Sequence, residues 1–570
     1  MNLDNIDIVY ITHNSDEWID RCFEAYSQSL FPSEKINILI VDIGSSDSSL
    51  KKLETVKDKY SFASISILKK ENGAGTGKAY NTAFAKGKSD IVCFFSIKTE
   101  IYPNTLTNLI DEIINTKNEK SVVWELMQYP YEHPKRYDIL TGETEWISGD
   151  SFAITREAFK TIGGFDETIS MYAEDVDLSF RLRSADYLLK YCPKAGIINN
   201  AYKNSDETKQ KQYINSIATN LLLRWRFGDR KDISNGYVLY KSLLKEELPF
   251  GCSKAAIKAA YRIHFFKIPH YVKWRLRKDN STAGFSFYDW EYEKRRLGDS
   301  YYQARPDQKP LVSVLTRTCG RPNVLRETLV SLRRQTYDNI EIIIVEDGEP
   351  ITQKMIENEF SDLRIVYSAT GEKVGRSIAG NIAMEKSGGK YLNFLDDDDL
   401  LYADHIETLV AAIEGSDYRA AYAVAEESSI IVNSTEPYSY DVVNTYVRYM
   451  VGFDRSKLYV NNIIPIQAIM FERTFFEKLG GFDCTLDLLE DWDLWVRYAS
   501  DDDFLFVEKS TSIYRVPNKK DVYDERHKRF EAAYDMCVNG FDKYIYNSSK
   551  VSDLSRSFAK LNEADMGHKE

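Results

Sequence analysis

Short apolar runs alternate with helical patterns in both halves of this chain of 570 residues. Runs rich in β-branched residues predict strands, and segments with apolar positions three and four apart predict helices between them. Alternation of this kind is typical of βαβ units that build a parallel sheet. The predicted strands are 6–11, 36–41, 64–68 and 91–95 in the first half, and 312–315, 340–345, 364–367 and 391–395 in the second.

Distinctive short sequences recur at matching places in the two halves. The sequence GGFD occurs at 163–166 and again at 480–483, and an acidic helix start follows each copy, EDVDL at 174–178 and EDWDL at 490–494. Similar copies separated by roughly 300 residues indicate an internal duplication.

Four consecutive aspartates, Asp396 to Asp399, follow the predicted strand 391–395. Carboxylates this close repel one another unless a cation lies among them, and a hard divalent cation together with a diphosphate fits such a cluster. The alternative is a solvated acidic turn. Because parallel strands end at one edge of a sheet, Thr316 and Asp347 are expected beside the aspartates. Arg376 opens a helix nearby, where a guanidinium and helix N–H groups bind phosphate well.

Asp491 and Leu494 lie three residues apart in a predicted helix and therefore share one face. Packing of that face would hold the carboxylate of Asp491 in place. A fixed carboxylate at the edge of a cleft is suited to act as a general base.

The ordered set TRTxxRP, VEDG, GRxxxGN, FLDDDD, GGFD and EDWDLW resembles the inverting family 2 glycosyltransferases of the GT-A fold, over residues 310 to about 515. The resemblance and the duplication imply an α/β protein with two Rossmann-like GT-A domains joined by a helical connector. The implied boundaries are 1–208, 209–305, 306–518 and 519–570. The second half of the duplication carries the complete set of motifs.

The resemblance also implies roles for residues of the second half. Asp347 would contact the nucleobase and Arg376 the nucleotide, while Asp398 would be the main ligand of Mn²⁺ or Mg²⁺ with Asp396 or Asp397 beside it. Asp491 would deprotonate the acceptor hydroxyl, with its neighbour Glu490 as the less favoured base. Thr316 and Arg321 are further candidates for donor binding.

The first half departs from this pattern at the acidic cluster. Lys98 occupies the position of Asp398, and Thr76 occupies that of Arg376. A lysine has only donors and cannot bind a metal ion. Two hypotheses follow: a metal-independent transferase in which Lys98, helped by Lys78, neutralises the leaving diphosphate, or a domain that only binds acceptor or supports the fold.

Other candidates in the first half follow from the same match of the two copies. Asp175, with Glu174 beside it, is the candidate base, and Thr12 and Asp42 are the candidates for donor binding. Retention of the EDVDL sequence favours an active first half.

Composition narrows the function classes. The content of 43% hydrophobic and 28% charged residues is ordinary for globular domains, and the net charge of −13 argues against general nucleic-acid binding. Seven scattered cysteines without a CxxC pair favour a reducing compartment. Without a secretory signal or an apolar segment of bilayer length, the sequence predicts a cytoplasmic location.

The predicted connector contains a local reversal of charge. Residues 251–278 carry eight Lys or Arg and no Asp or Glu, interleaved with aromatic residues. Such a segment favours a peripheral contact with the inner face of the cytoplasmic membrane or with an anionic glycan. The alternative is an inter-domain helix whose basic face meets the acidic domains.

These inferences together predict an enzyme that transfers hexosyl or deoxyhexosyl groups from nucleotide-diphospho-sugars to a growing bacterial polysaccharide or a polyprenyl-linked glycan. Catalysis by the second half alone is the alternative. A scaffold that binds glycans or nucleotides without turnover is a non-enzyme rival. A nucleotidyltransferase is less favoured, because the first strand of neither half leads into a glycine- and arginine-rich phosphate loop.

Overall fold

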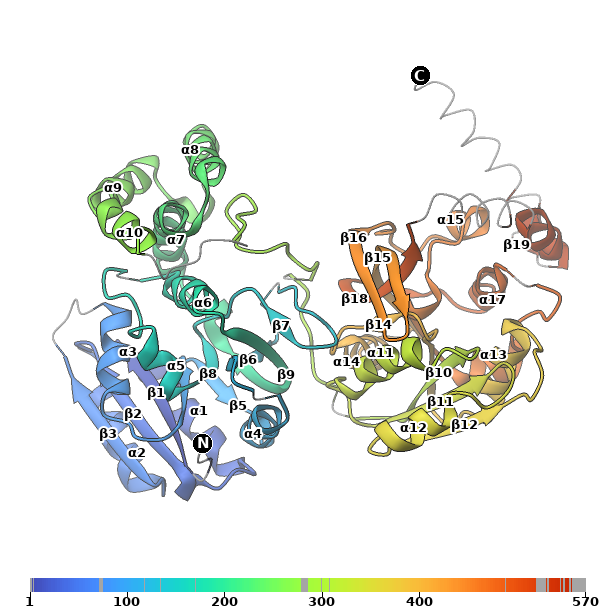
Figure 1. The fold of residues 1–570 in the computed structure, drawn as a ribbon, viewed down its shortest axis with the longest axis horizontal. Coiled ribbons are helices and arrows are strands. Elements are labelled where there is room, and N and C mark those ends of the chain that lie inside the picture. The colour runs from blue at the N-terminus through green and yellow to red at the C-terminus, as the bar shows by residue number, and fades with distance from the viewer. Residues whose placement is uncertain are drawn as a thin grey trace. The chain divides into compact units, whose positions relative to one another are not determined.

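The computed structural model describes residues 3–518 apart from 4, 71–74, 117, 134, 170, 278–284, 299, 307 and 487, and in the C-terminal part residues 529, 533–543, 545–546, 549–552 and 555. The chain divides into two compact units, Met1–Tyr302 and Gln303–Glu570, which we name unit 1 and unit 2 (Figure 1). Part of the glycine-rich stretch 72–78 and most of the C-terminal helix and tail expected at 525–570 lie outside the described residues.

Unit 1 is built on one mixed sheet with the order β3-β2-β1-β4-β8-β6-β9-β5, and β7 pairs with β9. Strands β1 to β4 are parallel, as the βαβ pattern predicts. The strands are β1 (Ile6–Thr12), β2 (Ile36–Asp42), β3 (Ser64–Lys69), β4 (Ile91–Phe95), β5 (Thr99–Ile101), β6 (Ser121–Tyr129), β7 (Glu143–Thr144), β8 (Ser151–Thr155) and β9 (Leu188–Asn199).

Apolar side chains cover both faces of this sheet, because the buried residues of β1 and β2 alternate between two hydrophobic clusters. The helices of unit 1 are α1 (Asp16–Glu24), α2 (Ser49–Lys59), α3 (Thr76–Phe84), α4 (Thr105–Thr116), α5 (Arg156–Thr161), α6 (Glu174–Ser184), α7 (Asp206–Phe227), α8 (Arg230–Leu243), α9 (Lys254–Phe265) and α10 (Ile268–Arg275), with 3₁₀ turns at Ala25–Gln28, Ser33–Lys35, Asn200–Lys203 and Pro249–Gly251.

Unit 2 repeats this sheet with the order β12-β11-β10-β13-β17-β15-β18-β14, and β16 pairs with β15. The strands are β10 (Val312–Thr318), β11 (Ile340–Glu346), β12 (Ile365–Ala369), β13 (Tyr391–Phe394), β14 (Leu400–Leu401), β15 (Ala420–Thr435), β16 (Tyr438–Val447), β17 (Ile469–Glu472) and β18 (Leu505–Pro517), and β19 (Ile545–Tyr546) pairs with β20 (Ser549–Lys550) in a separate small ribbon.

The helices of unit 2 are α11 (Pro322–Arg333), α12 (Gln353–Glu359), α13 (Arg376–Lys386), α14 (His405–Glu414), α15 (Arg455–Val460), α16 (Arg473–Leu479) and α17 (Glu490–Ala499), with 3₁₀ turns at Ile466–Ala468 and Phe541–Lys543. Trp492 and Trp495 of α17 are buried in the core of unit 2. Trp495 packs against Phe471 of β17, whereas Trp492 packs against Tyr534 and Phe541 of the C-terminal part and donates a hydrogen bond to the carbonyl of Leu458.

Strand pairing fixes which residues of the two units are equivalent. Ile6 lies opposite Ile36 and Ile91, just as Val312 lies opposite Ile340 and Tyr391. Counting along the first strands from these positions makes Thr12 equivalent to Thr318, and each is the last residue of its strand. The expected duplication is therefore present strand by strand, and the chain is an α/β protein with two domains whose sheets have the same strand order.

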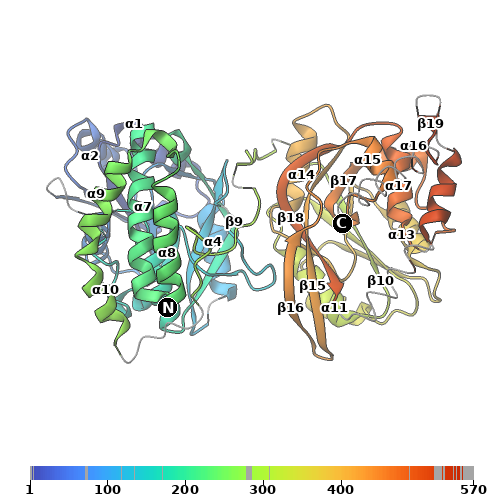
Figure 2. The same cartoon turned by 90° about the horizontal axis from the view of Figure 1, so that it is seen from above.

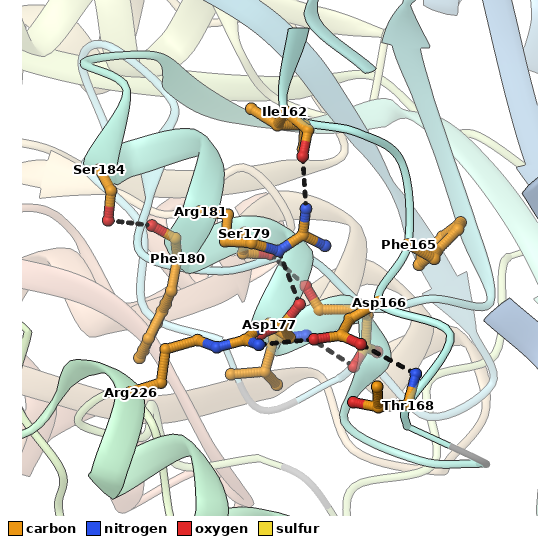
Figure 3. A network of polar contacts seen from close by, with 12 residues as sticks. Ile162, Phe165, Asp166, Thr168, Asp177, Ser179, Phe180, Arg181, Ser184 and Arg226 are labelled. Carbon is orange, nitrogen blue, oxygen red and sulfur yellow. Dashed lines mark hydrogen bonds and ion pairs between the residues drawn. The ribbon is translucent and has the colours of Figure 1, made fainter. Parts of the chain in front are cut away.

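The helices of the predicted connector belong to unit 1. Helix α7 packs against α8, α9 and α10 (Figure 2). At its C-terminal end, the buried Arg226 forms ion pairs with Asp166 and Asp177 (Figure 3). Asp177 also pairs with Arg181 at 2.7 Å, so α7 is tied to α6 and to the GGFD turn at once. The finer division of the chain at 208, 305 and 518 stays a prediction.

Candidate active sites in the two units

The carboxyl ends of β10, β11 and β13 meet at one edge of the sheet of unit 2. Arg317 and Thr318 come from β10, Asp347 follows β11, and the four aspartates follow β13. Ligands of open α/β sheets bind at this edge. Thr316 lies two residues before the end of β10, and its hydroxyl is buried without a hydrogen-bond partner among the described residues.

Arg317 lies at the centre of the polar network in unit 2. Its guanidinium donates two hydrogen bonds of 2.8 Å to the carboxylate of Asp396 and a third, of 3.0 Å, to Oε1 of Glu490. The Arg317 and Glu490 side chains are only 7% and 4% exposed. Burial alone would raise the pKa of Asp396, but the Arg317 charge lowers it below its usual value.

Arg321 forms a second network beside the first. It contacts both carboxylate oxygens of Asp397 and lies 3.3 Å from Oδ2 of Asp398. Asp397 also accepts a hydrogen bond of 2.7 Å from Thr318. Burial, with a further contribution from Asp398, raises the pKa of Asp397 to about 6 although Arg321 opposes the shift.

The aspartates differ in what they can offer a metal ion. Asp398 is 40% exposed, whereas Asp397 is buried and Asp396 is held on both oxygens by Arg317. In the described part of the chain, no group of three or more His, Cys, Asp or Glu side chains is arranged to hold a metal. The residues therefore fit a cation that takes one ligand from Asp398 and the others from a diphosphate and water.

Asp347 and Arg376 lie on either side of the turn that opens α13. The carboxylate of Asp347 accepts hydrogen bonds from the backbone N–H groups of Val374, at 2.6 Å, and Gly375. Gly375 has a φ of 95°, a left-handed conformation that favours glycine. Arg376, the first residue of α13, is half-exposed, and its guanidinium is 3.9 Å from Glu490. Its charge and the helix N-terminus are thus available to an anion.

Asp491 lies at the N-terminus of α17, next to Glu490. One of its oxygens accepts a hydrogen bond of 2.8 Å from the side-chain amide of Asn462. Burial, and then the negative charge of Glu490, raise the pKa of Asp491 to about 7. A carboxylate with this pKa accepts a proton far more readily than an ordinary aspartate does.

The equivalent edge of unit 1 keeps some of these features. Asp42 is buried, accepts a hydrogen bond of 2.9 Å from Thr12, and also binds the backbone N–H groups of Gly44 and Ser45. By strand register Asp42 matches Glu346, which is likewise buried within its own loop, and Ile43 matches Asp347. Unit 1 therefore has no carboxylate at the position of Asp347.

Lys98 is half-buried at the position equivalent to Asp398. Its ammonium group donates a hydrogen bond to the side chain of Asn204 and lies 5.9 Å from the ring centre of Trp18. Burial lowers the pKa of Lys98, and the nearby Asp150 opposes that change. Lys78, the other predicted cation, is exposed on α3.

Glu174 and Asp175 begin α6 as Glu490 and Asp491 begin α17. Asp175 accepts a hydrogen bond of 2.7 Å from the backbone of Gly149. Burial raises the pKa of Glu174 to about 8, with Asp175 adding to the shift, and burial raises the pKa of Asp175 to about 6. Asp150, adjacent to Gly149, contributes to both shifts.

The GGFD turns are braced in the same way in both units. The amide of Asn81 binds both the N–H and the carbonyl of Phe165, and Asn381 does the same at Phe482. A Cβ atom on Gly164 or Gly481 would meet the asparagine oxygen at 2.5 or 2.2 Å. These asparagines and glycines shape the turn that precedes the acidic helix.

The structure gives roles to four polar residues for which the sequence analysis proposed none: Arg317 and Asn462 bind Glu490 and Asp491, the charge of Asp150 acts on Asp175, and Arg226 pairs with Asp177 of the acidic helix. Arg317 was visible as part of TRT at a strand end, but its two partners are far away in sequence. The other three belong to segments without a recognised motif.

Comparison with known proteins gives the family context. The sequence profile of Glycosyl transferase family 2 matches residues 7–178 and 313–480. An uncharacterized glycosyltransferase of Rickettsia felis is 24% identical over 558 residues, which cover 92% of this chain and 80% of the relative. One of Rickettsia prowazekii is 27% identical over 190 residues, 33% of this chain and 58% of its own length.

Among solved structures, the mannosyltransferase PcManGT from Pyrobaculum calidifontis, in complex with GDP-Man and Mn²⁺, aligns with 48% of this chain and 88% of its own. The sequence identity is 13% and the TM-score 0.34. None of the described helices is long and apolar enough to cross a membrane. Since the family profile matches one region in each unit and together more than half of the residues, the chain belongs to glycosyl transferase family 2.

Proposed function

We propose that the protein carries two sites that transfer sugars from nucleoside-diphospho-sugars to acceptor hydroxyls with inversion. The observation that carries the proposal is a carboxyl with a raised pKa at an equivalent place in each unit, Asp491 and Asp175, at the start of the acidic helix. Hexosyl and deoxyhexosyl donors are the expected substrates, and a growing bacterial polysaccharide or a polyprenyl-linked glycan is the expected acceptor.

In unit 2, Asp491 takes the proton of the acceptor hydroxyl while the hydroxyl oxygen attacks the anomeric carbon. The bond from that carbon to the diphosphate oxygen breaks, and the nucleoside diphosphate leaves with the bonding electrons. A single displacement of this kind inverts the anomeric centre. Asn462 orients the base, because it donates to the carboxylate oxygen that does not bind the helix backbone.

The leaving diphosphate gathers negative charge, and unit 2 offers positive charge to meet it. Arg376 and the N-terminus of α13 face the expected phosphate position. Asp398 would hold Mn²⁺ or Mg²⁺. Asp396 or Asp397 would be a second ligand once it releases its arginine partner, Arg317 or Arg321. When bound, such an ion supplies Lewis-acid stabilisation of the departing oxygens.

Unit 1 replaces that arrangement by a fixed cation. Lys98 stands where Asp398 stands in unit 2, and its partner Asn204 is neutral. The ammonium group can therefore stabilise the leaving diphosphate without a metal ion. Thr12 and Asp42 would shape the donor site, and the exposed Lys78 would approach the phosphates.

Release of nucleoside diphosphate by the full chain tests the proposal against a panel of donors, with and without Mn²⁺. The Asp175→Asn variant should report unit 2 alone, and the Asp491→Asn variant unit 1 alone. Turnover in both variants supports two sites. Turnover that Asp491→Asn abolishes entirely would leave unit 1 as an acceptor-binding scaffold, and no turnover with any donor would refute an enzymatic role.

We also propose that residues 251–278 contact a membrane surface. Ile263, Phe265 and Phe266, near the α9–α10 corner, are 64%, 53% and 82% exposed, and Leu276, at the C-terminal end of α10, is 76% exposed. The exposed basic side chains of the same segment are Lys254, Lys258, Arg262, Lys273 and Arg277. Exposed apolar and basic side chains together suit the interface of an anionic bilayer.

Sedimentation with vesicles of anionic phospholipid tests this contact. Charge reversal of Lys254, Lys258 and Arg262 to Glu should release the protein from the vesicles. Reversal of three exposed lysines elsewhere in unit 1, Lys51, Lys86 and Lys88, is the matched control and should release it less. Equal binding of both variants would argue against the contact.

A further inference from the structure

The carboxyl pair that begins the acidic helix has different neighbours in the two units. In unit 2, Glu490 accepts a hydrogen bond from Arg317 at 3.0 Å, and Arg376 lies 3.9 Å away. Asp491, next in sequence, accepts one hydrogen bond from the neutral amide of Asn462 and another from the backbone N–H of Trp492. One member of the pair is thus paired with guanidinium, while the other faces neutral donors.

Unit 1 has an isoleucine where unit 2 has Arg317. The strand registers make Ile11 equivalent to Arg317, one residue before the terminal threonine of each strand. Thr76 likewise replaces Arg376 at the first position of the following helix. Oε2 of Glu174 is buried without a hydrogen-bond partner among the described residues of unit 1.

We propose that Arg317 is a positioning residue that decides which carboxyl of the Glu490–Asp491 pair takes the proton from the acceptor. It does so by pairing its guanidinium with Glu490, which leaves Asp491 as the member of the pair that takes the proton. The inference rests on the proposed function and adds to it the device that selects the base. In unit 1, where this device is absent, both carboxyls share the proton.

The physical reason is the cost of placing two negative charges side by side in a buried site. A guanidinium paired with one carboxylate offsets part of that cost for the neighbouring carboxylate. The single proton that the pair still binds near neutral pH then belongs to the other carboxyl. Without the guanidinium, the two protons leave in two steps that belong to the pair as a whole.

The pKa values of the two pairs agree with this contrast. Burial and then the charge of Glu490 raise the pKa of Asp491 to about 7, while Asn462 and the charge of Arg317 oppose the shift. In unit 1 burial raises both values, to about 8 for Glu174 and about 6 for Asp175. The other groups that act on the pair in unit 1 are Asp150, Glu125, Tyr80, Tyr172 and Tyr292. Asp150 is therefore a second difference between the units, and a change at Arg317 alone isolates the first.

The test measures the pH dependence of kcat/KM for nucleotide release by the full chain with Asp175→Asn, so that only unit 2 turns over. With Arg317 present, we expect one acid limb centred near pH 7. Arg317→Ile should split this limb into two steps, one below and one above the original midpoint. The activity at pH 7 should fall about fivefold, because a rise of the pKa from about 7 to about 8 lowers the deprotonated fraction at pH 7 from about one half to about one tenth.

Two matched variants separate this role from a merely structural one. Arg317→Lys keeps a positive charge and should keep the single limb. Arg317→Ile combined with Glu490→Gln removes the second carboxylate and should restore a single limb, below pH 7. Both isoleucine variants lose the partner of Asp396, so that loss cancels in their comparison. An unshifted single limb in Arg317→Ile would overturn the inference.

A second readout does not depend on turnover. When the pKa of a carboxyl is higher in the folded than in the unfolded state, the free energy of unfolding decreases as the pH rises towards the folded-state pKa. The melting temperature of Arg317→Ile should therefore fall further below wild type between pH 6 and 8.5, and Glu490→Gln should remove that trend. If Arg317→Ile does not fold, Ile11→Arg is the alternative variant. It should merge the two steps of the unit 1 pH profile into one, and unchanged steps would overturn the inference.

Absence of turnover in the wild-type chain would refute only the proposed function, because the melting curves still test the carboxyl pair.

Discussion

Unit 1 and unit 2 share the order of their strands, the braced GGFD turn and the acidic helix, yet they differ in almost every charge beside the strand ends. Where unit 2 has Arg317 and Asp398, unit 1 has Ile11 and Lys98. The shared features are held by buried apolar residues and by amide groups. The duplication thus preserved the frame, while a few positions at one edge of the sheet set the charge of each site.

The strongest test of the comparison removes the candidate base from one unit at a time. Asp491→Asn should lower transfer by unit 2 by about 10²- to 10⁴-fold, because an amide cannot accept the proton. Asp175→Asn should do the same to unit 1. Rates of nucleotide release with the donor of each unit measure both effects. Each variant is the control for the other, and a loss in both units from one change would contradict independent sites.

The next test addresses the ion-pair network that ties α7 to the core of unit 1. Arg226→Met should reduce the free energy of unfolding by about 3–5 kcal/mol, since it leaves Asp166 and Asp177 buried without their shared partner. Denaturant unfolding of the full chain measures the change.

Unit 2 supplies the matched control for this variant. Arg497→Met removes a pairing of 2.9 Å with Asp493, the residue equivalent to Asp177. Its effect should be smaller, because Arg226 joins two carboxylates, those of Asp166 and Asp177, through one guanidinium. An equal loss of stability in both variants would mean that α7 is not specially anchored.

Metal removal should separate the units. A chelator should lower the rate of transfer by unit 2 on the order of 10²-fold, because the metal ion lowers the activation free energy, and it should leave the rate of unit 1 unchanged. Asp398→Asn should reproduce the effect of the chelator in unit 2. In unit 1, Lys98→Met should slow transfer at any metal concentration. A unit 1 that loses activity with chelator would show that Lys98 does not replace the ion.

The smallest expected difference is in the pH dependence of the two rates. Each base must lose its proton to act, so each rate rises with pH through the relevant pKa. The rise should centre near pH 7 in unit 2 and begin near pH 6 in unit 1, with a further step near pH 8 as the Glu174–Asp175 pair loses its second proton. Profiles of kcat/KM in the two single-unit variants measure this. Coincident profiles would show that the different neighbours of the two pairs have no effect on the reaction.

The apolar pattern predicted the frame of both units closely. The expected strand 91–95 is β4 itself, and the expected strand 391–395 exceeds β13 by one residue. The match of Lys98 with Asp398 also agrees with the strand registers. Such predictions succeed because buried strands need continuous apolar runs whatever the rest of the chain does.

The partners of the site residues could not be predicted in the same way. The sequence marks Asp396 as a candidate metal ligand, but the structure pairs both of its oxygens with Arg317. It marks Glu490 and Asp491 as neighbours of similar chemistry, whereas a guanidinium from β10 contacts only the first. These contacts join segments separated by more than 70 residues in the chain, and no local pattern records them.

By itself, the sequence determined that there are two α/β copies and which carboxylates and cations lie at the edge of each sheet, because strand periodicity and the order of motifs are properties of the chain. Only the tertiary structure decided which charges neutralise each other there. Burial and distance set the pKa of a carboxyl, and both depend on side chains that the fold brings together from distant segments.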